Sequence, residues 1–438
     1  MEKIMFYTRV NGIPQFQNVA VKIAGPFTLK VCPGVLDIGE HTVTVDRAVD
    51  IHVPAPEVFH VRDEEYPKLV EFDEKAWGGW MRGTRLRGLI TEECSAPGLL
   101  IPGTVRVKPS RGSVKPFVLD RDYRLESFWA TVGRTPESSI KYDQTVYIDY
   151  DYVPCRLDSI VVNQAGDVRL VTGRPGVGAM MPPKLKKGEV TFANLWFQGP
   201  TAKITPENLY PIEPEKDLEP DNQKQASKTL LPKTLGKIRQ SKPLTILAWG
   251  DSVTCYNMYQ TMFVDLLKER FPDVKINLIT VAWGGHRSED FLNASPGDSY
   301  NFQEKCIQPS PDLVTVEFVN DADAYLDEGE VIKRYGLIID KFRAIGTEVV
   351  LITPHFIRSD RMGKNTMKFD DDPRPYVKGL RKTASKYRVA LADSSKLWGQ
   401  LWRQGIPYIT LLSNSINHPD KRGHQLYAKA LMSLFPNK

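Results

Sequence analysis

The second half of the chain alternates short apolar runs with amphipathic stretches. Apolar runs of strand length lie at residues 244–249, 276–281, 313–319, 349–353 and 389–392. Apolar residues at helical spacing follow at 256–271, 329–345, 374–387 and 421–435. This alternation predicts a parallel sheet with helices on both faces, a three-layer α/β domain over residues 244–438. Ligands of such sheets bind at the carboxyl ends of the strands.

The first half has a different pattern, in which short apolar runs alternate residue by residue. In residues 145–153, Val146, Ile148 and Tyr150 fall on one face and Asp149 on the other, which indicates a half-buried strand. A hairpin is predicted at 159–171, around a loop that contains glycine. Further short runs lie at residues 28–31, 42–45, 51–53 and 105–107. We expect an all-β, antiparallel sandwich-like region over residues 1–215. One arrangement of this region is a smaller β unit at residues 1–60 followed by a sandwich at residues 61–215.

A polar segment with several prolines separates the two halves. Residues 216–243 are typical of a linker, and a short helix interrupted at Pro232 is expected within residues 226–240.

Composition excludes several classes of function. The chain has 438 residues, of which 41% are hydrophobic and 25% charged, with a net charge of +5 and no single-sign block that would bind nucleic acid. The longest apolar runs are too short to span a membrane. Five scattered cysteines give neither a disulfide framework nor zinc spacing, and the N-terminus lacks secretory features, so a cytoplasmic setting without metal is expected. The oligomeric state stays open.

A serine follows the first predicted strand of the second half, in the run Gly250-Asp251-Ser252. At a strand-to-helix turn its hydroxyl projects from the sheet edge, and the helix N-terminus offers backbone N–H groups to a developing oxyanion. The same tripeptide recurs at residues 297–299 without a strand before it, where it is interpreted as a turn. The preceding strand therefore distinguishes Ser252.

The ends of later elements carry further candidate groups. The glycine pair that ends at Gly285 follows the second strand and either brings backbone N–H groups close to a ligand or forms an ordinary turn. Asn320 follows the third strand and can donate to an oxyanion or cap a helix. His418 lies in a loop before the last helix, where a general base can reach across the strand ends. His424 is interpreted as a residue of that helix.

Together, in this order and at these spacings, the blocks resemble the SGNH (GDSL-type) hydrolase family over about residues 244–438. The resemblance implies that Ser252 is the nucleophile and that His418 takes its proton and returns it to the leaving group. It also implies an oxyanion hole made by the backbone N–H groups of Ser252 and Gly285 and the side chain of Asn320. The implied reaction is acyl transfer to water with no cofactor. Family members commonly deacetylate sugars or cleave simple esters and lipids.

Two positions depart from the family pattern. Phe318 stands where the third block usually has glycine, and a narrower pocket or a changed approach of the strand is expected. Ser415 stands three residues before His418, where the family usually has the aspartate that orients the histidine. Asn414 or Ser415, a backbone carbonyl, or Asp393 at a strand end are the open alternatives. A Ser–His dyad with a neutral orienting group is favoured.

Three more residues beside the strand ends, Asp251, Asp321 and His355, are candidate substrate contacts. Carboxylates near this edge also leave glycoside cleavage open, although a nucleophile placed before a helix fits that reaction less well.

The expected function is that of a serine esterase acting on a small-molecule or glycan ester, foremost an O-acetyl or other O-acyl group on a carbohydrate. The alternatives are an acyltransferase with the same Ser–His pair and a catalytically degenerate carbohydrate-binding protein. Trp77, Trp80 and Trp129 of the β half could stack on sugar rings, but filling a sandwich core is the favoured interpretation.

Overall fold

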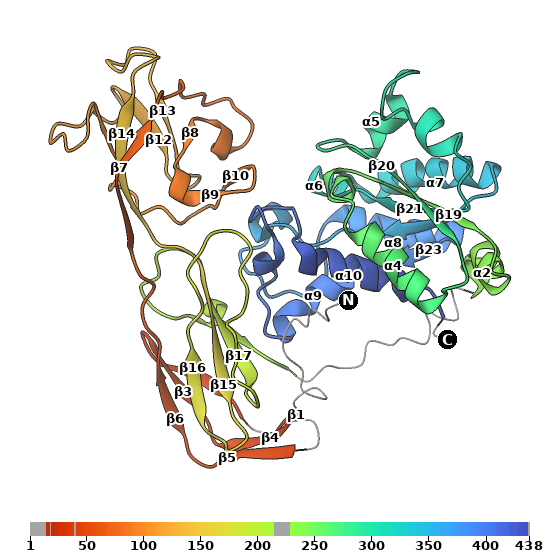
Figure 1. Cartoon of the computed structure of the whole chain (residues 1–438), viewed down its shortest axis with the longest axis horizontal. Coiled ribbons are helices and arrows are strands. Elements are labelled where there is room, and N and C mark those ends of the chain that lie inside the picture. Colours follow the sequence, from red (N-terminus) through yellow and green to blue (C-terminus); the bar gives the residue numbers. More distant parts are fainter. Residues whose placement is uncertain (1–14, 18, 39–40, 214–227, 437–438) are drawn as a thin grey trace. The chain divides into compact units, whose positions relative to one another are not determined.

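The computed structural model describes residues 15–17, 19–38, 41–213 and 228–436 (Figure 1). The chain forms two compact units, each with residues from two parts of the sequence. Unit 1 contains residues 1–214 and 402–416, and unit 2 contains residues 215–401 and 417–438.

Unit 1 consists mostly of antiparallel strands, as the sequence predicts. Two of its sheets come from the start of the chain and one from residues 156–211. These sheets have the orders β2-β3-β6, β1-β4-β5 and β16-β15-β17-β18. Their strands are β1 (Gln15–Gln17), β2 (Val21–Gly25), β3 (Thr28–Val31), β4 (Gly34–Ile38), β5 (His41–Val45), β6 (Val49–His52), β15 (Arg156–Val162), β16 (Val168–Val171), β17 (Val190–Phe197) and β18 (Leu209–Pro211).

A single apolar core joins these early and late strands. Leu29 and Val31 of β3 share it with Ile160 of β15 and Phe192 of β17. Because β3 buries only alternate side chains, its apolar face needs a partner sheet, which β15 and β17 supply with fully buried strands. This arrangement differs from the expected division at residue 60.

Residues 59–152 form further short sheets within unit 1. These have the orders β11-β14-β7, β12-β13-β8 and β10-β9. The strands are β7 (Phe59–Tyr66), β8 (Thr84–Arg85), β9 (Ile90–Thr91), β10 (Cys94–Ser95), β11 (Arg106–Lys108), β12 (Tyr123–Glu126), β13 (Thr131–Arg134) and β14 (Val146–Tyr152). The alternation predicted for β14 is confirmed, since Val146, Ile148 and Tyr150 are buried and Asp149 is not. Trp129 is buried, whereas Trp77 is 68% exposed, so core filling describes only part of the tryptophan group.

One segment from the far end of the sequence also belongs to unit 1. Residues 402–416 are held there by hydrogen bonds from Asn194 Nδ2 to the Gly405 carbonyl (2.7 Å) and from the Met180 backbone N–H to the Thr410 carbonyl (3.1 Å). The side chain of Ile416 packs with Cys94 and Trp129. The domain expected over residues 244–438 is therefore not continuous in space.

Unit 2 is built on the predicted parallel sheet, which has five strands in the order β20-β19-β21-β22-β23. The strands are β19 (Leu244–Gly250), β20 (Ile276–Ala282), β21 (Leu313–Glu317), β22 (Glu348–Ile352) and β23 (Ala390–Ala392). The second strand along the chain lies on one side of the first and the third strand on the other. In sheets of this kind, ligands bind at the carboxyl ends of the strands where the strand order reverses, which here is the end of β19.

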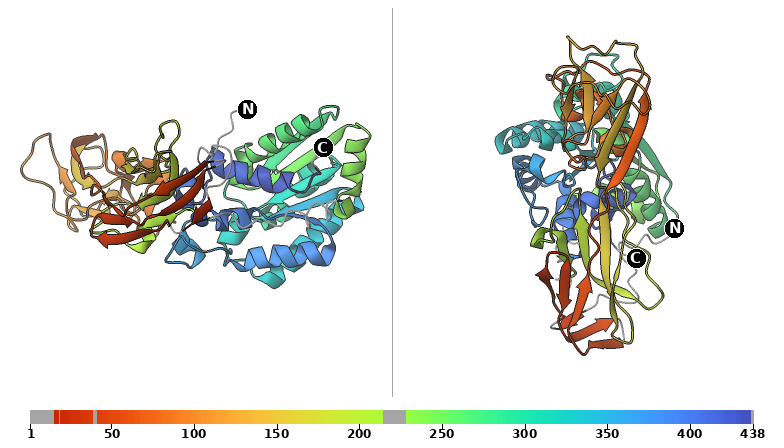
Figure 2. Two further views of the ribbon diagram at one scale, coloured as in Figure 1. Left: turned by 90° about the horizontal axis from the view of Figure 1, so that it is seen from below. Right: turned by 90° about the vertical axis from the view of Figure 1, so that its left-hand side faces the viewer.

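Helices cover both faces of this sheet, which gives three layers (Figure 2, left view). They are α2 (Pro232–Arg239), α3 (Ser252–Cys255), α4 (Tyr259–Arg270), α5 (Ser288–Asn293), α6 (Val319–Asp323), α7 (Glu328–Ala344), α8 (Pro375–Tyr387), α9 (Ser394–Gly399) and α10 (Lys421–Met432). Helices α7 and α8 pack together and share a core with Leu247, Trp249 and Val316 of the sheet. Helices α4 and α10 form a second pair.

The linker is described only in part, because residues 216–227 of the expected 216–243 segment lie outside the described residues. Residues 228–230 are helical and Leu231 is a bend, so the helical segment is interrupted directly before Pro232, the first residue of α2. Proline suits this position because its missing N–H would have no partner within the helix.

His424 of α10 shows how tightly α4 and α10 are packed. Its side chain is buried, and its ring stacks on Tyr259 of α4 with centroids 6.2 Å apart. Burial, with a smaller contribution from His418, lowers the pKa of His424 to about 3. The folded protein therefore holds this imidazole neutral.

We expect His424→Phe to make folding less sensitive to acid. Between pH 6.5, about the pKa of an unfolded histidine, and pH 3, the unfolded chain binds a proton that folded His424 does not, so acidification lowers the free energy of unfolding by about 1.4 kcal/mol per pH unit. In urea unfolding, the unchanged protein should lose about 2 kcal/mol more than the variant between pH 7.5 and pH 5. His52→Phe, at an exposed position of β6, is the control. Equal losses in all three proteins would contradict the expectation.

Candidate active site

Three neighbouring strands of unit 2 end at the same edge of the sheet, and the residues predicted from the sequence follow them. Ser252 follows β19, Gly285 follows β20 and Asn320 follows β21. Because Gly250 at the end of β19 is in register with Ala282 of β20 and Glu317 of β21, these three segments leave the sheet at the same edge.

The turn that carries Ser252 requires a glycine and an aspartate. A Cβ atom on Gly250 would lie 2.1 Å from Thr254 Oγ1 and 2.4 Å from the Glu317 carbonyl oxygen, so no larger residue fits there. Asp251 caps α3, with Oδ1 accepting a hydrogen bond from the Val253 N–H (3.2 Å). Ser252 is therefore the first residue of a short helix, partly exposed at the sheet edge.

Asp251 also connects this turn to the next strand. Its Oδ2 accepts a hydrogen bond from the backbone N–H of Asn320 (2.8 Å). Complete burial raises the pKa of Asp251, while the N–H groups of Asn320 and Val253 act in the opposite direction. A carboxylate with no exposed surface cannot reach a substrate, so the expected substrate contact is replaced by a structural link between two site segments.

His418 and Ser252 lie 166 residues apart in the sequence, but their side chains meet. His418 Nε2 is 3.1 Å from Ser252 Oγ, within hydrogen-bonding distance. His418 stands two residues before Asp420, which caps α10 by accepting hydrogen bonds from the backbone N–H groups of Arg422 (2.9 Å) and Gly423 (3.1 Å). This arrangement can transfer a proton between a hydroxyl and an imidazole.

The second ring nitrogen of His418 contacts a residue that the sequence analysis did not identify. Nδ1 lies 3.0 Å from the hydroxyl of Tyr256, which is 37% exposed. In the sequence, Tyr256 stands out only as the first of the apolar residues at helical spacing in 256–271. Its position four residues after Ser252, at the end of the helical turn that begins there, is the signal that could have identified it.

The other two strand ends can present hydrogen-bond donors. Gly285 has a φ of +75° in a turn closed by the Trp283 carbonyl and the His286 N–H, and this conformation favours glycine. Asn320 Nδ2 donates to the His286 carbonyl (3.0 Å), which orients the side chain. An amide nitrogen carries two hydrogens, so a second one is available to an oxyanion.

Phe318 does not narrow the site. Its side chain is completely buried and packs edge-to-face against Trp249, with centroids 4.9 Å apart, and against Phe291. The residue that replaces the family glycine therefore fills the core beneath α6.

Asp393, one of the alternatives for orienting His418, is used within its own part of unit 2. Its carboxylate accepts hydrogen bonds from Arg381 Nε (2.9 Å) and from the Thr353 hydroxyl (2.9 Å). These donors lower the pKa of Asp393 against the effect of burial, so the negative charge is paired at the end of β23.

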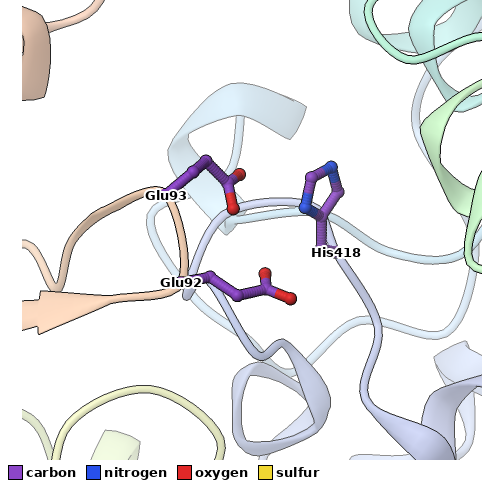
Figure 3. Close-up of side chains that lie close together, drawn as sticks. All are labelled: Glu92, Glu93 and His418. Carbon is purple, nitrogen blue, oxygen red and sulfur yellow. The ribbon is translucent and has the colours of Figure 1, made fainter.

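The other two alternatives belong to unit 1. Asn414 donates from Nδ2 to Glu93 Oε1 (2.9 Å) and accepts at Oδ1 from the Ile416 N–H (2.9 Å). Ser415 is buried with a φ of +59°. Figure 3 draws Glu93, with Glu92, on the turn between β9 and β10 of unit 1, and His418 on its loop in unit 2.

The two remaining candidate substrate contacts are also buried. Asp321 accepts hydrogen bonds from the hydroxyls of Ser288 and Tyr335, beneath α6. His355 has no exposed surface, and its ring nitrogens face the Tyr427 hydroxyl and the Asn417 carbonyl. Neither placement fits contact with a substrate.

We expect Asp251→Ala to destabilise the protein and to slow any reaction at Ser252. The variant loses a helix cap and leaves the Asn320 N–H without its acceptor, at a cost of about 2 kcal/mol. The free energy of unfolding of Asp251→Asn should lie between those of the unchanged protein and Asp251→Ala, because its amide keeps one acceptor oxygen. Urea unfolding measures this order of stability. Asp298→Ala, in the second Gly-Asp-Ser tripeptide, is the matched control. An unfolding free energy unchanged in Asp251→Ala would contradict the linking role.

Comparison with known proteins gives one family match and several distant structural neighbours. A model of the GDSL-like lipase/acylhydrolase family matches residues 246–426. Among solved structures, the acetylxylan esterase Axe2 from Geobacillus stearothermophilus is 18% identical, with a TM-score of 0.36 over 43% of this chain and 92% of its own. LAE5, an alpha/beta hydrolase enzyme from the metagenome of Lake Arreo in Spain, is 20% identical, with a TM-score of 0.36 over 44% of this chain and 94% of its own. No curated protein matches the sequence.

The described part of the chain contains no helix that is both long enough and apolar enough to cross a membrane. Residues 246–426 carry the family match, and they include the three strand ends and the histidine loop described above. Over residues 246–426 the chain is therefore a GDSL-like lipase/acylhydrolase domain.

Proposed function

We propose that the chain is a serine esterase that hydrolyses an O-acyl group, foremost an acetyl group, on a carbohydrate. The observation that carries the proposal is the contact between Ser252 Oγ and His418 Nε2 (3.1 Å) at the carboxyl edge of the sheet. Nucleophile and base at hydrogen-bonding distance are what acyl transfer through a covalent intermediate requires.

In this mechanism Ser252 Oγ attacks the ester carbonyl carbon while His418 Nε2 takes the hydroxyl proton. The tetrahedral intermediate then collapses, and His418 returns the proton to the leaving alcohol. Water, activated by the same imidazole, attacks the acyl group on Ser252 and releases the acid. Acylation and deacylation each form one acyl–oxygen bond and break another, and in the second the proton returns to Ser252, with no change of oxidation state.

Tyr256 supports the tautomer that this mechanism needs. Nε2 of His418 must be free to accept the serine proton, so Nδ1 carries the hydrogen and donates it to the Tyr256 hydroxyl oxygen 3.0 Å away. A phenol gives less charge stabilisation to the imidazolium than a carboxylate does. Tyr256 thus acts as a neutral orienting group of the kind expected from the sequence.

The oxyanion would be bound by three donors: the backbone N–H groups of Ser252 and Gly285 and the side-chain amide of Asn320. One donor of this kind contributes about 3 kcal/mol to transition-state stabilisation. The fixed Asn320 amide and the glycine turn at Gly285 support the assignment, since both are set before a substrate arrives.

An exposed aromatic residue beside the nucleophile supports a carbohydrate as the alcohol part of the substrate. Trp283 is 42% exposed and packs against Tyr300 and His286. It directly precedes Gly284, where a Cβ atom would lie 3.8 Å from Ser252 Cβ. A flat apolar ring with a polar edge suits a sugar ring, whose faces are apolar and whose rim carries hydroxyls.

We expect Ser252→Ala to abolish ester hydrolysis, whereas Ser299→Ala, in the second Gly-Asp-Ser tripeptide, should leave it intact. The measurement is acetate release from p-nitrophenyl acetate and from acetylated oligosaccharides, with covalent labelling of Ser252 by a fluorophosphonate. Adding unacetylated sugar as an acceptor distinguishes hydrolysis from transfer, because transfer would reduce acetate release. Absence of Ser252-dependent release from any ester would favour the binding-protein alternative.

We expect Trp283→Ala to raise KM for an acetylated oligosaccharide by about tenfold, the loss of one stacking contact of about 1.4 kcal/mol. The kcat/KM value for p-nitrophenyl acetate should stay within about twofold, since that ester has no sugar ring to stack. Tyr142→Ala, which removes an exposed aromatic residue of unit 1, is the control. A KM change of the same size for both esters would contradict recognition of the sugar.

A further inference from the structure

His355 lies directly behind the loop that carries His418. It follows β22, its side chain is completely buried, and its ring packs against Trp398 and Tyr427. His355 Nε2 is 2.7 Å from the backbone carbonyl oxygen of Asn417. Asn417 is the residue immediately before His418. This contact is thus one peptide unit away from the base of the proposed mechanism.

The contact with Asn417 fixes the tautomer of His355. A carbonyl oxygen only accepts hydrogen bonds, so Nε2 carries the hydrogen and donates it. The ring is neutral, because burial and the neighbouring Arg374 charge hold the pKa of His355 well below its ordinary value. Nδ1 must then be an acceptor, and it faces the Tyr427 hydroxyl at 2.8 Å.

Tyr427 connects His355 to a buried carboxyl behind it. The Tyr427 hydroxyl accepts a hydrogen bond from the His355 backbone N–H (2.8 Å). Its one hydrogen faces two acceptors, His355 Nδ1 at 2.8 Å and Glu317 Oε1 at 3.2 Å, and the contact to His355 is the shorter. Burial and the neighbouring Asp251 raise the pKa of the Glu317 carboxyl well above its ordinary value, against the hydrogen bonds from Tyr427 and Thr254 and the charge of Arg374.

A buried ion pair holds the backbone of His355 from the other side. Arg374 Nη2 donates to the His355 carbonyl (2.7 Å), and the same guanidinium binds the carboxylate of Asp372 (Nη2–Oδ2 2.6 Å). Both side chains of this pair are completely buried. The N–H and the carbonyl of His355, and both ring nitrogens, therefore have partners, which leaves the ring little freedom to turn.

We propose that His355 is a positioning residue of the esterase site. The hydrogen bond from its Nε2–H to the Asn417 carbonyl holds the His418 loop, and Tyr427 fixes the tautomer that can donate this bond. The inference rests on the proposed function. On the other side of His418, Pro419 and the cap residue Asp420 fix the start of α10. His355 supplies the matching restraint before the histidine. A displacement of about 1 Å in such a group can cost about a hundredfold in rate.

Two polar substitutions at position 355 separate positioning from mere stability. In His355→Gln the amide nitrogen takes the place of Nε2 and can still donate to Asn417, whereas in His355→Asn it takes the place of Nδ1 and cannot. We expect His355→Gln to keep kcat within about threefold, and His355→Asn to lose about 10- to 100-fold in kcat with KM nearly unchanged. In His355→Asn the rate of fluorophosphonate labelling of Ser252 should fall in parallel with kcat. Urea unfolding of both variants gives the folded fraction to which rates are normalised.

Equal kcat values for the Gln and Asn variants would overturn the proposal, as would a change confined to KM, which indicates substrate contact. Tyr427→Phe, which lets the imidazole change tautomer, should reduce kcat, while Tyr376→Phe removes a buried hydroxyl that pairs with Tyr335 and should not. An unchanged kcat in Tyr427→Phe would count against the role of Tyr427. Failure of the esterase proposal itself looks different, because the unchanged protein would then show no Ser252-dependent hydrolysis or labelling.

Discussion

The candidate active site depends on one buried carboxylate. Asp251 accepts hydrogen bonds from the backbone N–H groups of Val253 and Asn320, so a single side chain fixes both the turn of the candidate nucleophile and the strand end of the candidate oxyanion donor. Placing this group in the interior costs free energy, which the two N–H donors offset. The turn that carries Ser252 and the segment that carries Asn320, which follow different strands of the sheet, are thereby held at a fixed distance from each other.

A second set of buried polar groups lies behind the histidine loop. Glu317, Tyr427 and His355 come from β21, α10 and the segment after β22, and each is completely buried. Such a network is costly unless every member finds a partner, and when it does, it defines one arrangement of the elements that meet there. Buried hydrogen bonds thus lie behind both the Ser252 turn and the His418 loop.

The path of the chain adds a constraint that concerns the whole protein. Residues 402–416 belong to unit 1, and the chain returns to unit 2 at Asn417, one residue before His418. Asn414 is bound there to Glu93, and Ile416 packs with Cys94 and Trp129. The segment that leads to the candidate base is therefore part of the β-rich unit.

Periodicity alone predicted the five parallel strands and their main helices, because the apolar pattern of a buried strand or an amphipathic helix is local in sequence. The position of residues directly after predicted strands, together with the family resemblance, likewise indicated Ser252, Gly285, Asn320 and His418. The fold brings these residues to one edge of the sheet.

What the sequence could not determine depends on distant partners. The link from Asp251 to Asn320, the inward side chain of Phe318 and the buried place of His355 follow from contacts with residues about 70 positions away. Local pattern likewise could not show that residues 402–416 fold with the first unit, or that β2–β6 share a core with β15–β18. Local periodicity determines the elements, whereas burial and hydrogen-bond partners are decided only when these elements pack.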